Sequence, residues 1–269
     1  MPSALPLITL LTDFGTRDYF VASLKGVILT INPDARIVDL SHDIAPHAVT
    51  EGAYMLQACY RAFPEGTIHL AVVDPGVGSN RRPILAKTSR YYFVAPDNGI
   101  LSPILDDVSD VEIRQLENPR YRLESPGATF HGRDIFAPAA AWLSRGAVPS
   151  SFGPPVCDPV KTDWPKPTVT DEAIAGQIVY VDRFGNLISN LTMRDIAPTR
   201  AGSRRLAPLI RLADYTIGGL VGSYSEGDSS RPCALINSDG RLEIFLKERS
   251  AAAVMAAGPG APVVVRMLR

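Results

Sequence analysis

Two short segments of the chain carry side chains that could act together on a water molecule. The first, V-V-D-P-G-V-G-S-N-R-R at residues 72–82, ends an apolar run in Asp74 and turns on glycines before Arg81 and Arg82. The second, T-F-H-G-R-D-I-F-A-P at residues 129–138, places His131 just before an expected helix. A carboxylate can accept a proton, a guanidinium can hold that carboxylate, and an imidazole can orient or relay a proton. Together these residue types predict an enzyme.

Each of these residues, taken alone, also has a structural interpretation. Asp74 could simply cap its own turn, the two arginines could be solvated, and a lone histidine is commonly a core residue with its hydrogen bonds satisfied. What favours a site is their conjunction, because α/β enzymes build their sites where the ends of several elements converge.

A repeated pattern in the first half of the chain indicates which elements position these residues. Apolar runs lead to an aspartate and a nearby glycine at residues 7–15, 69–76 and 91–99, and helical patterns ended by prolines occupy residues 19–31 and 50–63. Apolar strands that alternate with helices predict a parallel sheet covered on both faces, with ligands bound beyond the carboxyl ends of its strands. We therefore expect Asp13, Asp74 and Asp97 at one edge of the sheet.

The second half of the chain shows a different pattern. Residues 134–143 predict one more helix, a proline-rich stretch follows it, and strands separated by turns are expected beyond at residues 175–182, 187–191, 216–221, 232–237, 242–246 and 262–267. Short strands with little helix are typical of a small β-barrel or sandwich. The predicted fold is α/β: an N-terminal domain with a mostly parallel sheet (1–150), a linker (151–172) and a smaller C-terminal β-barrel domain (173–269).

Composition excludes several classes of protein. A net charge of −1 over 269 residues gives no support for a nucleic acid or an anionic membrane as partner. The first apolar run stops at Asp13 and has no basic residues before it, which indicates a strand rather than a signal peptide or a spanning helix. Cys59, Cys157 and Cys233 lack metal-binding or disulfide spacing, so we expect reduced thiols and a cytoplasmic protein.

A metal site is chemically conceivable. Asp13, His42, Asp43, Asp74 and His131 are residue types that suit a divalent ion, but their spacing matches no established metal motif. We expect no metal and no cofactor.

Seven motifs in order along the chain resemble one family, the S-adenosylmethionine (SAM) hydroxide adenosyltransferases, which include adenosine-forming SAM hydrolases and are related to fluorinase and chlorinase. The motifs are L-T-D-F-G-T, S-H-D-I-A-P, V-V-D-P-G-V-G-S-N-R-R, A-P-D-N-G-I-L, T-F-H-G-R-D-I-F-A-P, V-D-R-F-G-N-L-I-S-N and I-N-S-D-G-R-L-E-I, spread over residues 7–253. The resemblance implies an α/β domain, a β-barrel, and a homotrimer that binds its substrate between neighbouring subunits.

The resemblance also implies roles for individual residues. Asp74, Arg81 and His131 would be the triad that handles the attacking water. The substrate-binding residues would be Asp13 on the ribose hydroxyls, Asp182 on the methionine ammonium, Asn186 on adenine, Ser238 at the methionine end, Glu243 near the adenosine, and Phe130 and Phe184 as apolar walls. Two positions differ from fluorinase: His47 stands where fluorinase has a tryptophan, and Asp239 where it has an arginine.

The reaction implied is attack of water on C5′ of the ribose, which expels methionine as a neutral thioether and yields adenosine. Charge favours water over a halide as the nucleophile. A halide held ~4 Å from an ionised Asp74 would be repelled by about 4 kcal/mol at an effective dielectric of ~20. In the resemblance, halogenases carry an uncharged aromatic residue in place of Asp74 and have no histidine at position 131.

Three alternatives stay open. They are a SAM-dependent halogenase resembling chlorinase, a SAM- or adenosine-binding protein without turnover, and a metal-dependent hydrolase. The residues also do not decide which sulfonium epimer of SAM is the substrate.

Overall fold

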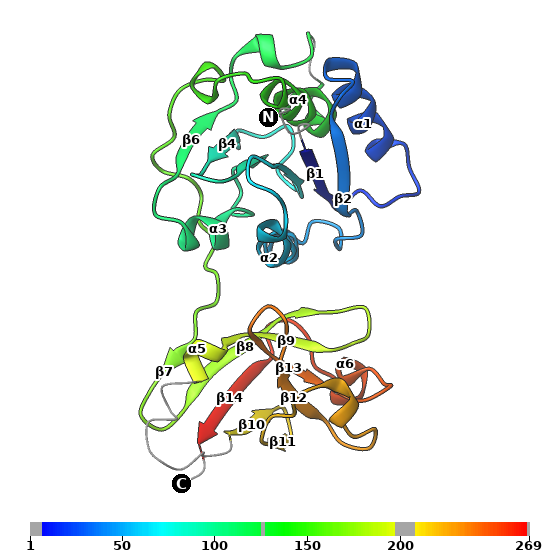
Figure 1. Cartoon of the computed structure of the whole chain (residues 1–269), viewed down its shortest axis with the longest axis vertical. Coiled ribbons are helices and arrows are strands. Elements are labelled where there is room, and N and C mark those ends of the chain that lie inside the picture. The colour runs from blue at the N-terminus through cyan, green and yellow to red at the C-terminus, as the bar shows by residue number, and fades with distance from the viewer. Residues whose placement is uncertain (1–6, 125–126, 197–207, 268–269) are drawn as a thin grey trace. The chain divides into compact units, whose positions relative to one another are not determined.

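The computed structural model describes residues 7–124, 127–196 and 208–267. Its contacts divide the chain into two units, Met1–Trp164 and Pro165–Arg269. Both are drawn in Figure 1 and are described separately.

A six-stranded sheet forms the centre of the first unit, in the order β2-β1-β3-β5-β4-β6. Four neighbouring strands are parallel and only β4 runs against its neighbours, which confirms the predicted mostly parallel sheet. The strands are β1 (Leu7–Thr12), β2 (Arg36–Ser41), β3 (Ile68–Val72), β4 (Pro83–Lys87), β5 (Tyr92–Pro96) and β6 (Glu112–Gln115).

Helices cover both faces of this sheet because its central strands are apolar on both sides. Leu10 belongs to a core with α1 (Phe20–Ile31) and α4 (Ala137–Ser144), whereas Leu11 belongs to a second core with α2 (Val49–Cys59) and α3 (Ser102–Asp107). Figure 1 shows α1 beside α4 and, separately, α2 near α3. The three layers leave the carboxyl ends of β1, β3 and β5 along one edge, and Thr12 pairs with Val72 just before Asp13 and Asp74.

The second unit is an antiparallel sheet that curls into a nearly closed barrel, as predicted (Figure 1). Its strand order is β11-β10-β14-β8-β9-β13-β12, with β7 paired to β8. Beyond β11, the Val221 amide donates to the Ala234 carbonyl at 2.9 Å and links the two ends of the sheet. The elements are β7 (Thr168–Val169), β8 (Ile174–Val181), β9 (Leu187–Thr192), α5 (Met193–Ile196), β10 (Pro208–Leu212), β11 (Tyr215–Gly218), β12 (Cys233–Ile236), β13 (Arg241–Phe245), α6 (Ala251–Met255) and β14 (Pro262–Met267).

The proline-rich stretch before the barrel lies against the first unit. Phe152 and Val156 are buried in its two cores, and Trp164 packs on the second of them. The Val160 amide donates to Asp97 Oδ1 at 2.8 Å, and Arg82 Nη1 lies 2.7 Å from Asp158 Oδ1. Residues 152–164 thus add apolar contacts and hydrogen bonds to the α/β unit. None of the helices in the described ranges has the length and apolar character needed to cross a bilayer.

Candidate active site

A pocket of about 520 Å³ opens at the carboxyl ends of β1 and β3. Two carboxylates, two imidazoles and several aromatic rings contribute to its wall. The residues that line it are Asp13, Phe14, Tyr19, Phe20, Pro46, His47, Val72, Asp74, Val77, Thr129, Phe130, His131, Gly132 and Arg133. This is the edge at which the sequence places a site.

Asp74, Arg81 and His131 come together at this pocket. Arg81 Nε donates to Asp74 Oδ1 at 2.9 Å and to Oδ2 at 3.0 Å, and Arg81 Nη2 also bonds Oδ2. The same Nη2 lies 2.7 Å from His131 Nδ1. Asp74 and His131 line the pocket, while Arg81 lies behind them and joins them, with its guanidinium 5.1 Å from the Phe136 ring centre.

The arginine determines the state of the imidazole. Because a guanidinium can only donate, Nδ1 of His131 must accept, and the hydrogen of the neutral ring is then on Nε2. Burial lowers the pKa of His131 below its usual value, and the positive charge of Arg81 lowers it further, while Asp74 opposes the shift. His131 is therefore neutral near neutral pH.

A π-helical turn, η3 (Gly132–Phe136), follows His131 and leads directly into α4. Its backbone bond runs from the Ala137 amide to the Gly132 carbonyl, five residues apart rather than four. The sequence predicts an ordinary helix from residue 134, so the helical segment starts earlier and with a wider turn than expected. Wide turns of this kind are frequently found at functional sites.

The three strand-end aspartates have different surroundings. Asp13 lines the pocket and accepts a hydrogen bond at Oδ2 from the His47 amide at 2.9 Å. Asp97 instead is buried and paired with Arg82, whose Nη2 lies 2.7 Å from Asp97 Oδ2. The two neighbouring arginines therefore have different partners. Arg81 binds the pocket residues Asp74 and His131, whereas Arg82 binds Asp97 and, in the proline-rich stretch, Asp158. All three aspartates follow strands that end at the predicted edge, and Asp13 and Asp74 are the two that line the pocket.

Aromatic rings form one wall of the pocket. Phe130 packs edge-on against Phe14 and Phe20, with ring centres 5.9 Å and 5.3 Å apart. Tyr19 extends this cluster and is 66% exposed. Ring faces beside carboxylates suit a ligand that carries a positive charge.

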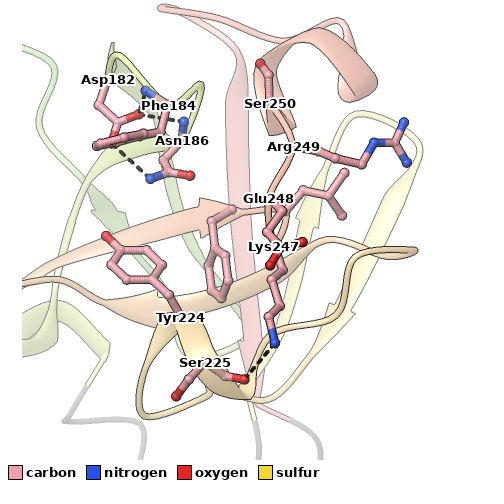
Figure 2. Close-up of a pocket in the computed structure, with 11 residues that line it drawn as sticks. Asp182, Phe184, Asn186, Tyr224, Ser225, Lys247, Glu248, Arg249 and Ser250 are labelled. Atoms are coloured by element: carbon pink, nitrogen blue, oxygen red, sulfur yellow. Dashed lines mark hydrogen bonds between the residues drawn. The ribbon is translucent and has the colours of Figure 1, made fainter.

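A second pocket, of about 690 Å³, lies in the barrel unit (Figure 2). The turn between β8 and β9 contributes one side of it and the segment before α6 the other. The residues that line it are Asp182, Phe184, Asn186, Tyr224, Ser225, Phe245, Leu246, Lys247, Glu248, Arg249 and Ser250. Three of the predicted substrate-binding residues, Asp182, Phe184 and Asn186, are therefore brought together here.

Asp182 holds the turn on which these residues lie. Its Oδ1 accepts the amides of Phe184 and Asn186 at 2.9 Å and 2.8 Å, and its Oδ2 accepts Asn186 Nδ2 at 2.9 Å. The Asn186 side chain is thereby fixed, with its oxygen directed away from Asp182 (Figure 2). Phe184 is 77% exposed and presents a free ring face at the pocket.

Glu243 and Ser238 lie outside the lining of this pocket. Glu243 on β13 is buried and accepts Tyr224 Oη at 2.6 Å and Asn237 Nδ2 at 3.1 Å, so it acts on the pocket through Tyr224. Burial, and then the bond to Glu243, raise the pKa of Tyr224. Ser238 is exposed in the turn between β12 and β13.

Some residues that line the two pockets were not predicted from the sequence. Tyr224 comes from a loop without periodicity, so no pattern pointed to it. Phe14 and Phe20 follow the predicted Asp13 in D-F-G-T-R-D-Y-F, where aromatic residues just beyond a strand end were the available signal. Within the described ranges, no three His, Cys, Asp or Glu side chains are grouped as metal ligands would be.

Comparison with known proteins gives consistent matches over both units. Residues 8–153 match the model of the SAM hydroxide adenosyltransferase N-terminal domain, and residues 176–264 match that of the C-terminal domain. A protein of Thermus thermophilus named (R)-S-adenosyl-L-methionine hydrolase is 36% identical over 94% of this chain and 96% of its own length. A protein of the same name from Methanocaldococcus jannaschii is 35% identical over 89% of this chain and 88% of its own.

The fold is also shared with a solved structure. The crystal structure of a conserved protein from Thermotoga maritima superposes with a TM-score of 0.90 at 32% identity, over 96% of this chain and 99% of that one. Similarity thus extends through the α/β unit and the barrel.

Proposed function

This chain belongs to the SAM hydroxide adenosyltransferase family, and on that premise we propose that it hydrolyses SAM to adenosine and methionine. The observation that carries the proposal is the pairing of Asp74 and His131 through one arginine at the wall of a pocket. An ionised carboxylate at that wall favours water over an anion as the nucleophile. The name shared by the relatives agrees with this choice.

In the proposed step, the water oxygen attacks C5′ of the ribose as the C5′–sulfur bond breaks. The electron pair of that bond goes to sulfur, which leaves as the neutral thioether of methionine. Asp74 accepts the proton that the water loses, and Nε2–H of His131 donates to the water oxygen and orients it. Because the leaving group is neutral, the step as written needs no metal and no redox cofactor.

Substrate binding would use the predicted residues of both units. Asp13 would hold the ribose hydroxyls, Asp182 the methionine ammonium and Asn186 the adenine, while Phe130 and Phe184 would cover apolar surface. Aromatic rings beside carboxylates also suit the sulfonium cation. Ser238 and Glu243 remain proposed for the methionine and adenosine ends, and Glu243 would act through Tyr224.

We also propose that the protein is a cytoplasmic homotrimer with substrate bound between neighbouring subunits. Exposed aromatic rings at both pockets, Tyr19 and Phe184, would be covered by such an arrangement. Cys59, Cys157 and Cys233 form no disulfide, which suits a reducing compartment. Sedimentation equilibrium would give three times the mass of the chain if the trimer forms.

The test of the proposed activity is product analysis. The protein is incubated separately with each sulfonium epimer of SAM, in isotopically labelled water and with or without chloride, and the products are separated by chromatography. We expect labelled adenosine and methionine, and the epimer consumed faster identifies the substrate. Release of 5′-chloro-5′-deoxyadenosine as the main product would indicate a halogenase, and binding without product would indicate a sensor.

A further inference from the structure

Strand β1 carries two threonine–histidine pairs of the same geometry. Thr9 Oγ1 lies 2.8 Å from His69 Nδ1, and Thr12 Oγ1 lies 2.8 Å from His42 Nδ1. All four residues are buried. The first pair lies midway along the sheet, whereas the second lies at the carboxyl end of β1, directly before Asp13.

The second pair is connected to the backbone of the two residues that follow Asp13. The Phe14 amide donates to Thr12 Oγ1 at 3.3 Å, and the Gly15 amide donates to the His42 carbonyl at 2.7 Å. Asp13 therefore lies within a short segment that is held by Thr12 before it and by His42 after it. Its neighbour Phe14 supplies a ring to the aromatic wall of the same pocket.

His42 is in turn held from its other side. Its Nε2 lies 3.2 Å from Asp39 Oδ1, and Lys25 Nζ lies 2.6 Å from Asp39 Oδ2. Nε2 makes no hydrogen bond to the described residues, but the negative charge of Asp39 beside it favours the tautomer with hydrogen on Nε2, so Nδ1 accepts the hydrogen of the Thr12 hydroxyl. The Thr12 oxygen keeps its lone pairs for the Phe14 amide. The hydrogen bonds then run in one direction, from Phe14 through Thr12 to His42.

We propose that Thr12 and His42 are positioning residues of the active site, which fix the backbone around Asp13 and so aim its carboxylate and the Phe14 ring at the substrate. The proposal rests on the proposed function and adds residues to it that do not line the pocket. It also gives a role to the buried imidazole of His42, which Asp39 of the edge strand β2 approaches while Lys25 pairs with Asp39.

The Thr9–His69 pair provides a matched control. Thr12→Val and Thr9→Val each remove one buried hydroxyl, leave one histidine Nδ1 unpaired and keep the shape of the side chain. We expect similar losses in urea unfolding midpoint, but only Thr12→Val raises KM for SAM, by about tenfold, the size of effect that one buried hydrogen bond produces. The kcat changes little, because a contact to the ribose is made equally in the ground state and the transition state. Thr12→Ser, which keeps the hydroxyl, restores the KM.

An unchanged KM in Thr12→Val, or an equal rise in Thr9→Val, overturns the proposal. Failure of the proposed function looks different, because wild-type protein then releases no adenosine from either epimer. In that event, amide hydrogen exchange at Phe14 and Gly15 still decides whether the hydrogen bonds of Thr12 and His42 hold this segment. Faster exchange in Thr12→Val than in Thr9→Val supports it, and equal exchange in the two variants refutes it.

Discussion

Arg81 gives two neighbouring groups different tasks. By donating to both oxygens of Asp74 it orients that carboxylate, and by donating to Nδ1 it keeps His131 neutral with its hydrogen on Nε2. One side chain thus prepares a proton acceptor and a hydrogen-bond donor at the same pocket wall. The roles differ although the two groups are joined through a single nitrogen.

Replacing Asp74 by asparagine tests the acceptor. The amide keeps the size of the side chain but takes up no proton, so kcat should fall by about 10²- to 10⁴-fold while KM changes little. Adenosine release measures the rate, and calorimetric titration with adenosine checks that the pocket still binds. A kcat within threefold of wild type would contradict the assigned role.

The pH profile tests the state of His131. Its pKa lies below the usual 6.5, so the ring is neutral at neutral pH and gains a proton only in acid. Protonation places a hydrogen on Nδ1 and breaks the bond from Arg81. We expect kcat/KM to be flat around pH 7 and to fall with an inflection below 6.5, measured as the initial rate of adenosine release. An acid inflection above that value would falsify this assignment.

In the barrel, Tyr224→Phe tests the support of the second pocket. The substitution removes the Tyr224 hydroxyl from the buried Glu243 and leaves the bond from Asn237 Nδ2, which should cost about 1–3 kcal/mol of unfolding free energy and weaken adenosine binding. Tyr215→Phe is the control, since its hydroxyl makes only an exposed bond of 3.4 Å to the Val254 carbonyl. Equal urea midpoints for the two variants would show that Glu243 does not depend on Tyr224.

At the scale of elements, the strands with continuous apolar runs were predicted to within a few residues, among them β1, β3, β5 and β14. The runs of β1, β3 and β5 each lead to an aspartate and a nearby glycine, which marks both the end of the strand and the edge of the sheet. The prediction missed β2, β4, β6, β7 and β10. In β2 and β10, R-I-V-D-L-S and P-L-I-R-L mix charged and apolar residues without a continuous run. Residue spacing could bring Arg81 to Asp74. His131 was a candidate by its residue type and its place before an expected helix, and its part in a triad was implied by the family resemblance.

The buried His69 on β3 makes the sheet sensitive to acid. Burial among aromatic rings lowers its pKa from 6.5 to about 4. Above pH 6.5 the ring is neutral in both states, so it has no effect. Between 6.5 and 4 the unfolded chain binds a proton that the folded chain does not, and stability falls by up to about 3 kcal/mol.

The double variant Thr9→Val/His69→Leu removes this dependence without leaving a hydroxyl unpaired. Urea unfolding at about pH 7 and about pH 4.5 gives the free energy of unfolding at each pH. This free energy should fall less between the two pH values in the variant than in wild type, because the unfolded variant has no His69 to protonate. Other groups titrate in both proteins, so only the difference counts. The same loss in both would mean that His69 is already protonated in the fold.

At the scale of the whole molecule, each unit has cores of its own. The two cores of the α/β unit and the core of the barrel share no residues. The stretch up to Trp164 belongs to the first of these units by its contacts. Folding of one unit should therefore not require the other.

Two fragments test this division. Residues 1–164 should fold cooperatively, whereas residues 1–150 lack Phe152, Val156 and the amide that binds Asp97. Loss of the buried Phe152 ring alone costs about 3–5 kcal/mol by comparison with core truncations. Urea unfolding followed by circular dichroism compares the two, and identical midpoints would place the boundary near residue 150 instead.

The five-residue spacing between the Gly132 carbonyl and the Ala137 amide makes segment length itself a determinant of chemistry. Deleting one residue there would let the helix close with its ordinary spacing and swing everything upstream by roughly 100° about the axis. The imidazole would then leave the guanidinium although no residue of the triad had been replaced. A homologue one residue shorter at this place could keep all three side chains and still be inactive. The number of residues between the histidine and the following alanine should therefore distinguish active from inactive homologues.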